Sequence, residues 1–271
     1  MSGPFGSSQF FGVAAGGDTP GYTVSKSVYV NRGDSPEILM PNSDGGGLKY
    51  IMSVWFKLTE FNSSYRHTLV SVHDTSGYGV TVEISGSGGA GDHQLYWLDD
   101  GRGIVGSAAK AERCTQRLFR DPTAWYHVVL FWDSANTNPD ARMNMWINGV
   151  FQSEWNTSYY TNPGASQKSA WGGSTEDVDI FNTNNARYWD GYVSQFAWIY
   201  GQDYTASNFG EFDTNGVWRP KDLTDLDFSG AESFWLDFAD NNDFGNDVSG
   251  QNNDGTVSNI ASANQVTDTP S

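Results

Sequence analysis

The residues best suited to bind a metal in this sequence are aspartates and asparagines gathered near its end. Between residues 237 and 255, one loop offers side-chain oxygens from Asp240, Asn242, Asp243, Asp247 and Asp254. Calcium takes about six to eight oxygen ligands, so this loop is a candidate calcium site. Aspartate and asparagine also form turns by accepting hydrogen bonds from nearby backbone, and we favour that alternative. A second source of ligands is Asp177, Asp179 and Asp190.

Hydrolysis of glycans would need a pair of carboxylates. Retaining glycosidases hold two carboxyl groups about 5–5.5 Å apart, and on one strand face this corresponds to the pattern E-x-D-x-(x)-E, because alternate residues point the same way. The nearest stretches are EDVDIF at Glu176–Phe181 and GEFDTNG at Gly210–Gly216, and both lack the second glutamate. His127 with Asp133 suggests part of a triad, but this histidine lies in an apolar run and is expected to be packed. We therefore expect no enzymatic activity and assign no catalytic residue.

Aromatic side chains offer a third kind of chemistry, the stacking of sugars. The C–H groups on one face of a sugar meet the negative face of an aromatic ring. The candidate carbohydrate ligands combine rings with neighbouring Asp or Asn side chains: Trp97, Asp99, Asp100, Asn144, Trp146, Asn148, Tyr159 and Tyr160. Six other aromatic residues are expected in the core: Trp55, Trp125, Phe131, Trp132, Phe196 and Trp198.

Short strands and turns must position these residues. Leu48–Glu60 alternates between two faces, whereas Trp125–Asp133 is apolar on both faces and is predicted to be a central strand. Asn148-Gly149 predicts a two-residue type I′ turn between strands at 142–149 and 150–155. One short helix is expected at Thr205–Phe212, with Thr205 as its cap. The remaining expected strands are 26–33, 67–74, 79–86, 93–103, 190–201 and 233–240.

The even spacing of strands and turns predicts an all-β protein, an antiparallel two-sheet sandwich of jelly-roll type. We expect a single jelly-roll domain over residues 23–271. Residues 1–22 are predicted to form an arm, in which Gly, Ser and Pro are interleaved with Phe5, Phe10 and Phe11. A pure linker would lack these aromatic side chains. The arm is therefore expected to anchor the protein by inserting into a groove of a partner.

The charge balance limits the partners of the protein. The sequence has 15 Lys and Arg against 32 Asp and Glu, a formal net charge of −17. Binding to nucleic acid needs a basic face, and anionic lipid surfaces attract basic segments, so we expect neither partner. Cys114 is the one cysteine, which excludes an internal disulfide. The first residues lack the basic and apolar regions of a secretory signal.

Four segments occur in the order found in laminin-G-like, concanavalin-A-like jelly rolls. They are SVYVNRGDSPEILMP at Ser27–Pro41, YIMSVWFKL at Tyr50–Leu58, WYHVVLFWD with MNMWINGV, and WDGYVSQFAWIYGQDYTASNFGEF at Trp189–Phe212. The sequence resembles this family over roughly residues 25–212. The resemblance implies the same sandwich fold. Domains of this family often hold calcium, so the resemblance also keeps Ca²⁺ open as a cofactor.

The two ends of the sequence resemble laminin-G-like proteins of tailed bacteriophages, particularly marine ones. In those proteins a Gly/Phe-rich start precedes the jelly roll, and the end is similar to SNIASANQVTDTPS at Ser258–Ser271. The resemblance implies a virion surface protein, a capsid decoration, head fibre or tail fibre, made in the host cytoplasm. Its arm would bind other virion proteins, and its jelly roll would project outward in a homo-oligomer.

The sequence thus predicts a non-enzymatic virion surface protein that can also bind a host surface glycan. The first alternative is a calcium-dependent carbohydrate-binding adhesin. A glycan hydrolase is the third hypothesis, and the missing carboxylate pair disfavours it.

Overall fold

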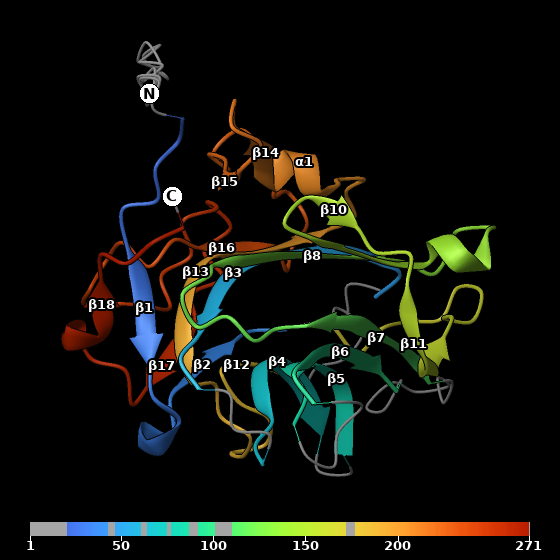
Figure 1. Ribbon diagram of the computed structural model, residues 1–271, viewed down its shortest axis with the longest axis horizontal. Helices are drawn as coiled ribbons and strands as arrows, with labels where there is room; N and C mark the ends of the chain where they lie inside the picture. Colours follow the sequence, from blue (N-terminus) through green and yellow to red (C-terminus); the bar gives the residue numbers. More distant parts are fainter. Residues whose placement is uncertain are drawn as a thin grey trace, which may run out of the picture.

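The computed structural model describes residues 21–42, 47–60, 64–74, 77–86, 92–100, 110–171 and 177–270. Within these ranges two large antiparallel sheets stack face to face (Figure 1). The protein is therefore all-β, an antiparallel jelly-roll sandwich, as the sequence predicts. Phe5, Phe10 and Phe11 of the expected arm lie outside the described residues. No described helix is long and apolar enough to cross a membrane.

Eight described strands form each large sheet. In spatial order, sheet A contains β10 (Val150–Phe151), β9 (Met143–Ile147), β8 (Tyr126–Asp133), β3 (Lys49–Leu58), β13 (Gly191–Tyr200), β1 (Ser27–Val30) and β18 (Gln265–Val266), and β16 (Phe234–Leu236) also pairs with β13. Sheet B contains β11 (Trp155–Thr161), β7 (Ala111–Leu118), β6 (Gln94–Asp99), β5 (Gly77–Ile84), β4 (His67–Asp74), β12 (Val178–Ile180), β2 (Glu37–Met40) and β17 (Thr256–Ser258).

Smaller elements decorate the sandwich. The helix α1 (Ala206–Phe209) and a two-stranded ribbon, β14 (Gly210–Phe212) with β15 (Trp218–Pro220), lie over the outer face of sheet A (Figure 1). Three short 3₁₀ turns complete the described elements: η1 (Arg32–Asp34), η2 (Pro139–Ala141) and η3 (Ser262–Asn264). The ribbon and α1 thus cover a sheet face that would otherwise meet solvent.

The main hydrophobic core lies between the two sheets. On β3, Tyr50, Met52, Val54 and Phe56 face this core, and the alternate residues point outward, which confirms the predicted alternation. Aromatic rings fill much of the space, and Trp171 and Trp198 stack with centroids 4.0 Å apart and planes 3° apart. Complete burial of such a side chain stabilises the fold by about 1.5–3 kcal/mol. Trp132, Phe196 and Trp198 belong to this core, and Trp55 is 3% exposed, as expected.

Two of the expected core residues lie elsewhere. Residues 125, 127, 129 and 131 point to the outer face of sheet A, because alternate residues of β8 face opposite sides. Trp125 is only half-buried there, and its Nε1 donates to Asp268 Oδ1 at 3.0 Å. Phe131 is half-buried against the second hydrophobic cluster, beneath α1. The outer face of β8 is apolar because α1 and the ribbon cover part of it.

The turn at Asn148-Gly149 was predicted from the sequence, whereas two edge strands were not. Asn148 and Gly149 both have positive φ values, 48° and 76°, as a type I′ turn requires. The expected helix is shorter than predicted, because Gly210–Phe212 continues as β14. Thr205 occupies the N-cap position, and its backbone N donates to Asn208 Oδ1 at 2.9 Å. The short strands β17 and β18, which add one edge to each sheet, had no recognisable alternation in the sequence.

Candidate functional site

The structure places the first group of predicted sugar ligands inside the protein. Trp97 is fully buried between the sheets, with its ring centroid 6.3 Å from that of Trp132. Asp99 is also fully buried, and Asp100 is half-buried. The prediction that Trp97 and Asp99 contact a sugar is therefore wrong, because neither side chain reaches the surface. The physical reason is the alternation of β6, which turns residues 95, 97 and 99 toward the interior.

The predicted tyrosine pair lies on β11, at the edge of sheet B. Tyr160 is 37% exposed, and the Arg113 guanidinium lies 3.9 Å from its ring centroid. Tyr159 is half-buried and packs edge-on against Tyr96 at 5.7 Å. Both rings already have partners within the fold. They also lie on the sheet opposite Trp146, so the structure does not bring the two groups together.

The third group lies on the outer face of sheet A, where more aromatic rings gather than the sequence predicted. Trp146 pairs with Phe151 across the β9–β10 hairpin, and their ring centroids are 5.5 Å apart. Phe212 pairs with Trp218 across the β14–β15 ribbon in the same way, at 4.8 Å. The two phenylalanines are 50% and 54% exposed, and the two tryptophans are partly buried. We call these four residues the aromatic patch.

Two exposed aliphatic residues are adjacent to the aromatic patch in the sequence, and strand alternation turns Val150 to the face of β10 opposite Phe151. Val150, beside Phe151, is 55% exposed, and Val217, beside Trp218, is 46% exposed. Single exposed apolar residues are normal on a protein surface, but a contiguous group of them indicates a binding site. The outer face of sheet A at β10 and the ribbon is therefore the candidate binding surface.

Close backbone packing fixes Trp218 within the patch. A Cβ atom on Gly149 would lie 2.4 Å from the Trp218 ring, and one on Gly210 would lie 2.5 Å from it. Gly149 also has a φ of 76°, which favours glycine. Both positions therefore need glycine, because the indole packs directly on the backbone. The hairpin turn that carries Trp146 and Phe151 is thereby joined to the ribbon that carries Phe212.

A buried histidine holds the indole from below. Trp218 Nε1 donates to His127 Nδ1 at 2.9 Å, which leaves the ring proton of His127 on Nε2. Nε2 then donates to Ser53 Oγ at 2.8 Å. The imidazole is fully buried and stacks on Trp55, with centroids 4.5 Å apart. Burial lowers the pKa of His127 to about 3, so the ring is neutral and acts as a packed anchor, as the sequence predicted.

The predicted asparagines lie beside the patch, but both also support the fold. Asn148 Oδ1 accepts a hydrogen bond from the His127 backbone N at 2.7 Å. Asn144 Nδ2 donates to Ala141 O at 3.2 Å. Near Trp218, Arg219 Nε donates to Asp213 Oδ2 at 3.0 Å, which neutralises this cation. The residues beside the aromatic patch are thus the amides of Asn144 and Asn148 and the Arg219–Asp213 ion pair.

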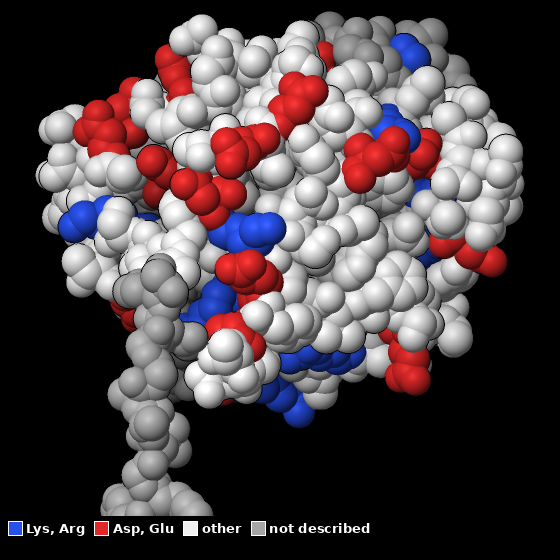
Figure 2. Space-filling model, turned by 90° about the horizontal axis from the view of Figure 1, so that it is seen from above, with Lys and Arg blue, Asp and Glu red and all other residues white. Residues whose placement is uncertain are grey.

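The charge on this side of the molecule is mainly negative. Figure 2 looks from above in Figure 1, onto the side that carries α1 and the ribbon, and shows groups of Asp and Glu together with fewer Lys and Arg among wide uncharged stretches. With a net charge of −17, the protein repels anions over a long range at low ionic strength. This face therefore disfavours an anionic ligand.

The predicted calcium ligands form turns. Asp240 Oδ1 accepts from Asn242 N at 2.8 Å, and Asp243 Oδ1 accepts from Gly245 N at 3.0 Å. Asp247 is 8% exposed and accepts from the backbone N of Trp235, Ser249 and Asn253 at 2.9–3.0 Å. Asp254 Oδ1 accepts from Asp247 N. These contacts confirm that the loop bonds its own backbone, and within the described ranges no three His, Cys, Asp or Glu side chains form a metal-binding group.

The acidic stretches considered for hydrolysis are separated by the fold. Asp179 of β12 is 3% exposed, and Glu176 lies outside the described residues. Glu211 and Asp213 lie on the ribbon above sheet A, whereas β12 belongs to sheet B. Asp190 is 6% exposed and accepts from the Arg32 backbone N at 3.3 Å. Burial raises the pKa of the Cys114 thiol to about 12, so this thiol is a poor nucleophile.

Comparisons with known proteins give structural relatives but no family. Neither a scan against protein-family models nor a search of curated proteins found a match. The chain is similar to a heptameric SAP-like pentraxin from Limulus polyphemus, with 12% identity, a TM-score of 0.40, and coverage of 65% of this chain and 77% of the pentraxin. Mouse laminin alpha1 domains LG4-5 give 12% identity, a TM-score of 0.43, and coverage of 68% and 44%.

A third similar structure is domain 4 of AbnA, an extracellular arabinanase from Geobacillus stearothermophilus, in complex with arabinotriose. It shares 14% identity with a TM-score of 0.42, and the alignment covers 64% of this chain and 69% of that domain. At such identities the similarity concerns the fold alone. The resemblance to laminin-G-like proteins and the bacteriophage origin both stay predictions.

Proposed function

We propose that the protein is a non-enzymatic glycan-binding protein and that the aromatic patch is its ligand surface. The observation that carries this proposal is the pairing of Trp146 with Phe151 and of Phe212 with Trp218 on one face. Rings held on strands lose little entropy when a ligand covers them, because the fold has already ordered them. The C–H face of a sugar ring suits such a surface, and the amides at its edge suit hydroxyl groups.

The expected ligand is a neutral polysaccharide. Arg219 is paired with Asp213, and the molecule has a net charge of −17, so an anionic glycan would meet long-range repulsion. A neutral glycan avoids this cost. The acidic residues of the molecule thus select against anionic glycans, whereas the aromatic patch provides the contact area for the ligand.

A glycan array tests this proposal. We expect fluorescently labelled protein to bind neutral polysaccharides in preference to uronate-, sulfate- or sialate-containing ones, equally with and without a chelator. Binding that is lost on chelation would support the calcium-dependent adhesin instead. Reducing-sugar release from a bound polysaccharide would support the hydrolase hypothesis. If no glycan is bound, the proposal is wrong.

The sequence resemblance adds a location to this function. We infer a virion surface protein from the Gly/Phe-rich start and the end at Ser258–Ser271. Peptide mass spectrometry on purified particles would test this, through the ratio of this chain to the major capsid protein. A ratio of the order of the capsid's symmetry sites would favour head decoration, and a few copies a particle would favour a tail adhesin. Absence from particles would contradict the location and leave glycan binding to be judged separately.

A further inference from the structure

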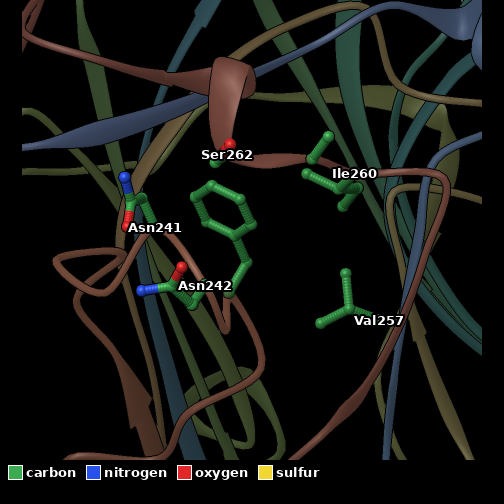
Figure 3. Close-up of a pocket in the computed structure, with 7 residues that line it drawn as sticks. Asn241, Asn242, Val257, Ile260 and Ser262 are labelled. Atoms are coloured by element: carbon green, nitrogen blue, oxygen red, sulfur yellow. The ribbon is translucent and has the colours of Figure 1, made fainter.

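A pocket lies on the side of the sandwich opposite β10, where one segment connects the edges of both sheets. β17 ends sheet B and β18 ends sheet A, and residues 259–264 run between them. The pocket, of about 370 Å³, opens between this segment and the loop at 240–246 (Figure 3). Its volume lies at the lower end of the range for ligand sites, about 300–1,000 Å³, so it suits one small ring.

The pocket has one polar and one apolar wall. Asn241 and Asn242 stand on one side, and Val257 and Ile260 lie across from them (Figure 3). Ser262 lies at one end (Figure 3). Phe244 also lines the pocket, although it is only 3% exposed. None of the described residues that line the pocket is charged. Such a lining accepts a neutral ligand with an apolar face and hydrogen-bonding groups.

Hydrogen bonds fix the polar wall before any ligand arrives. Asp240 Oδ1 accepts from both Asn242 N at 2.8 Å and Asn242 Nδ2 at 3.1 Å, which orients the Asn242 amide. Gly255 N donates to Gly245 O at 2.8 Å, and a Cβ on Gly245 would lie 2.1 Å from Gly255 O, so the two backbones are in direct contact. Asn241 is exposed, and its side-chain amide has no hydrogen-bond partner among the residues that the structure describes.

The opposite wall is equally fixed. Asn259 Nδ2 donates to Ser35 O at 3.0 Å, and Asn264 Nδ2 donates to Tyr29 O at 2.8 Å. Gln265 Nε2 joins the two walls, because it donates to Phe238 O and Ala239 O at 2.9 and 2.8 Å. The pocket is therefore preformed, which lowers the entropic cost of binding.

We propose that this pocket binds one neutral N-acetylated sugar residue, such as an N-acetylhexosamine. The acetamido group both donates and accepts a hydrogen bond, which matches the amides of Asn241 and Asn242. Its methyl group and the C–H face of the ring would contact Val257 and Ile260. A sugar without the acetamido group would leave part of this lining unpaired. This site is separate from the aromatic patch and goes beyond the function proposed for it.

Titration with N-acetylglucosamine, followed by saturation-transfer NMR, tests the proposal, with glucose as the matched ligand that lacks the acetamido group. We expect N-acetylglucosamine to bind more tightly than glucose. Ser262→Trp places an indole in the pocket mouth from an exposed position and should abolish binding. Asn241→Ala should weaken it about 2- to 10-fold, the usual effect of one lost hydrogen bond.

Matched controls separate the two sites. Ser158→Trp in β11 and Asn215→Ala in the β14–β15 turn change exposed residues of the same types outside the pocket lining, and both should bind N-acetylglucosamine like the unmodified protein. Phe212→Ala should also leave this binding unchanged. Three results would overturn the pocket: no binding of N-acetylglucosamine, equal binding of glucose, or binding that survives Ser262→Trp in a folded variant. A loss in Phe212→Ala alone would move the sugar to the aromatic patch, overturning the pocket but supporting the proposed function.

Discussion

The buried histidine beneath the aromatic patch should make the stability of the protein fall in mild acid. His127 is fully buried, and its two ring nitrogens are hydrogen-bonded to Trp218 and Ser53. Burial lowers its pKa to about 3 in the folded protein, whereas an unfolded histidine titrates near about 6.5. Below about pH 6.5 the unfolded chain therefore binds a proton that the folded chain excludes, and stability must decrease as the pH falls.

The size of the effect follows from the two pKa values. Each pH unit below about 6.5 costs about 1.4 kcal/mol, until the folded histidine is itself protonated near pH 3. Between pH 7 and pH 5 the loss is therefore about 2 kcal/mol. His127→Gln removes the titrating group and should lower stability at pH 7 by about 1–3 kcal/mol, because buried hydrogen bonds and ring packing are lost.

Urea unfolding of the unmodified protein and of His127→Gln at pH 7, 6 and 5 measures this effect. Other groups that titrate, including His67, whose pKa is lowered mainly by burial, are common to both proteins and cancel in the difference. The stability gap between the two proteins should shrink by about 2 kcal/mol from pH 7 to pH 5. A gap that stays constant would show that His127 does not stay neutral in the folded protein, and the account of how Trp218 is anchored would be wrong.

Two further substitutions test the packing that builds the sites. Asp247→Ala removes the acceptor for three backbone N–H groups near the pocket and should destabilise the protein by about 3 kcal/mol, measured by thermal unfolding; a loss below about 0.5 kcal/mol would contradict this role. Gly149→Ala places a methyl group 2.4 Å from the Trp218 ring at a positive φ and should cost about 1–3 kcal/mol. It should also change the tryptophan fluorescence of the folded protein, and an unchanged spectrum with unchanged stability would show that the turn does not hold the indole.

The parts of the fold that depend on local residue patterns could be predicted from the sequence. Alternation in 48–60 gave β3 and the face of each residue, and Asn148-Gly149 gave the turn between β9 and β10. That turn also implies that residue 146 pairs with residue 151, so Phe151 could have been found from register alone. The Asp-rich loop was correctly interpreted as turns, because its residue types form such bonds locally.

The candidate site depends on contacts between distant segments, which local patterns do not contain. Trp218 reaches His127 across 91 residues, and nothing around residue 218 predicts that contact. The prediction that Trp97 binds a sugar was wrong because a local pattern was misleading. Its acidic neighbours suggested a surface strand, but β6 turns Trp97 toward the interior. The pocket likewise needs two short edge strands that the sequence did not predict.

The affinity of the protein for a neutral polysaccharide, compared between Phe212→Ala and Tyr160→Ala, tests the central claim most directly. Both side chains are exposed aromatics, 54% and 37%, but Phe212 lies on the ribbon over sheet A, whereas Tyr160 lies on β11 of sheet B. Covering a half-exposed phenylalanine contributes about 1 kcal/mol, so Phe212→Ala should bind roughly fivefold more weakly. Tyr160→Ala should bind like the unmodified protein. The reverse result, with binding lost in Tyr160→Ala and kept in Phe212→Ala, would contradict the aromatic patch as the ligand surface.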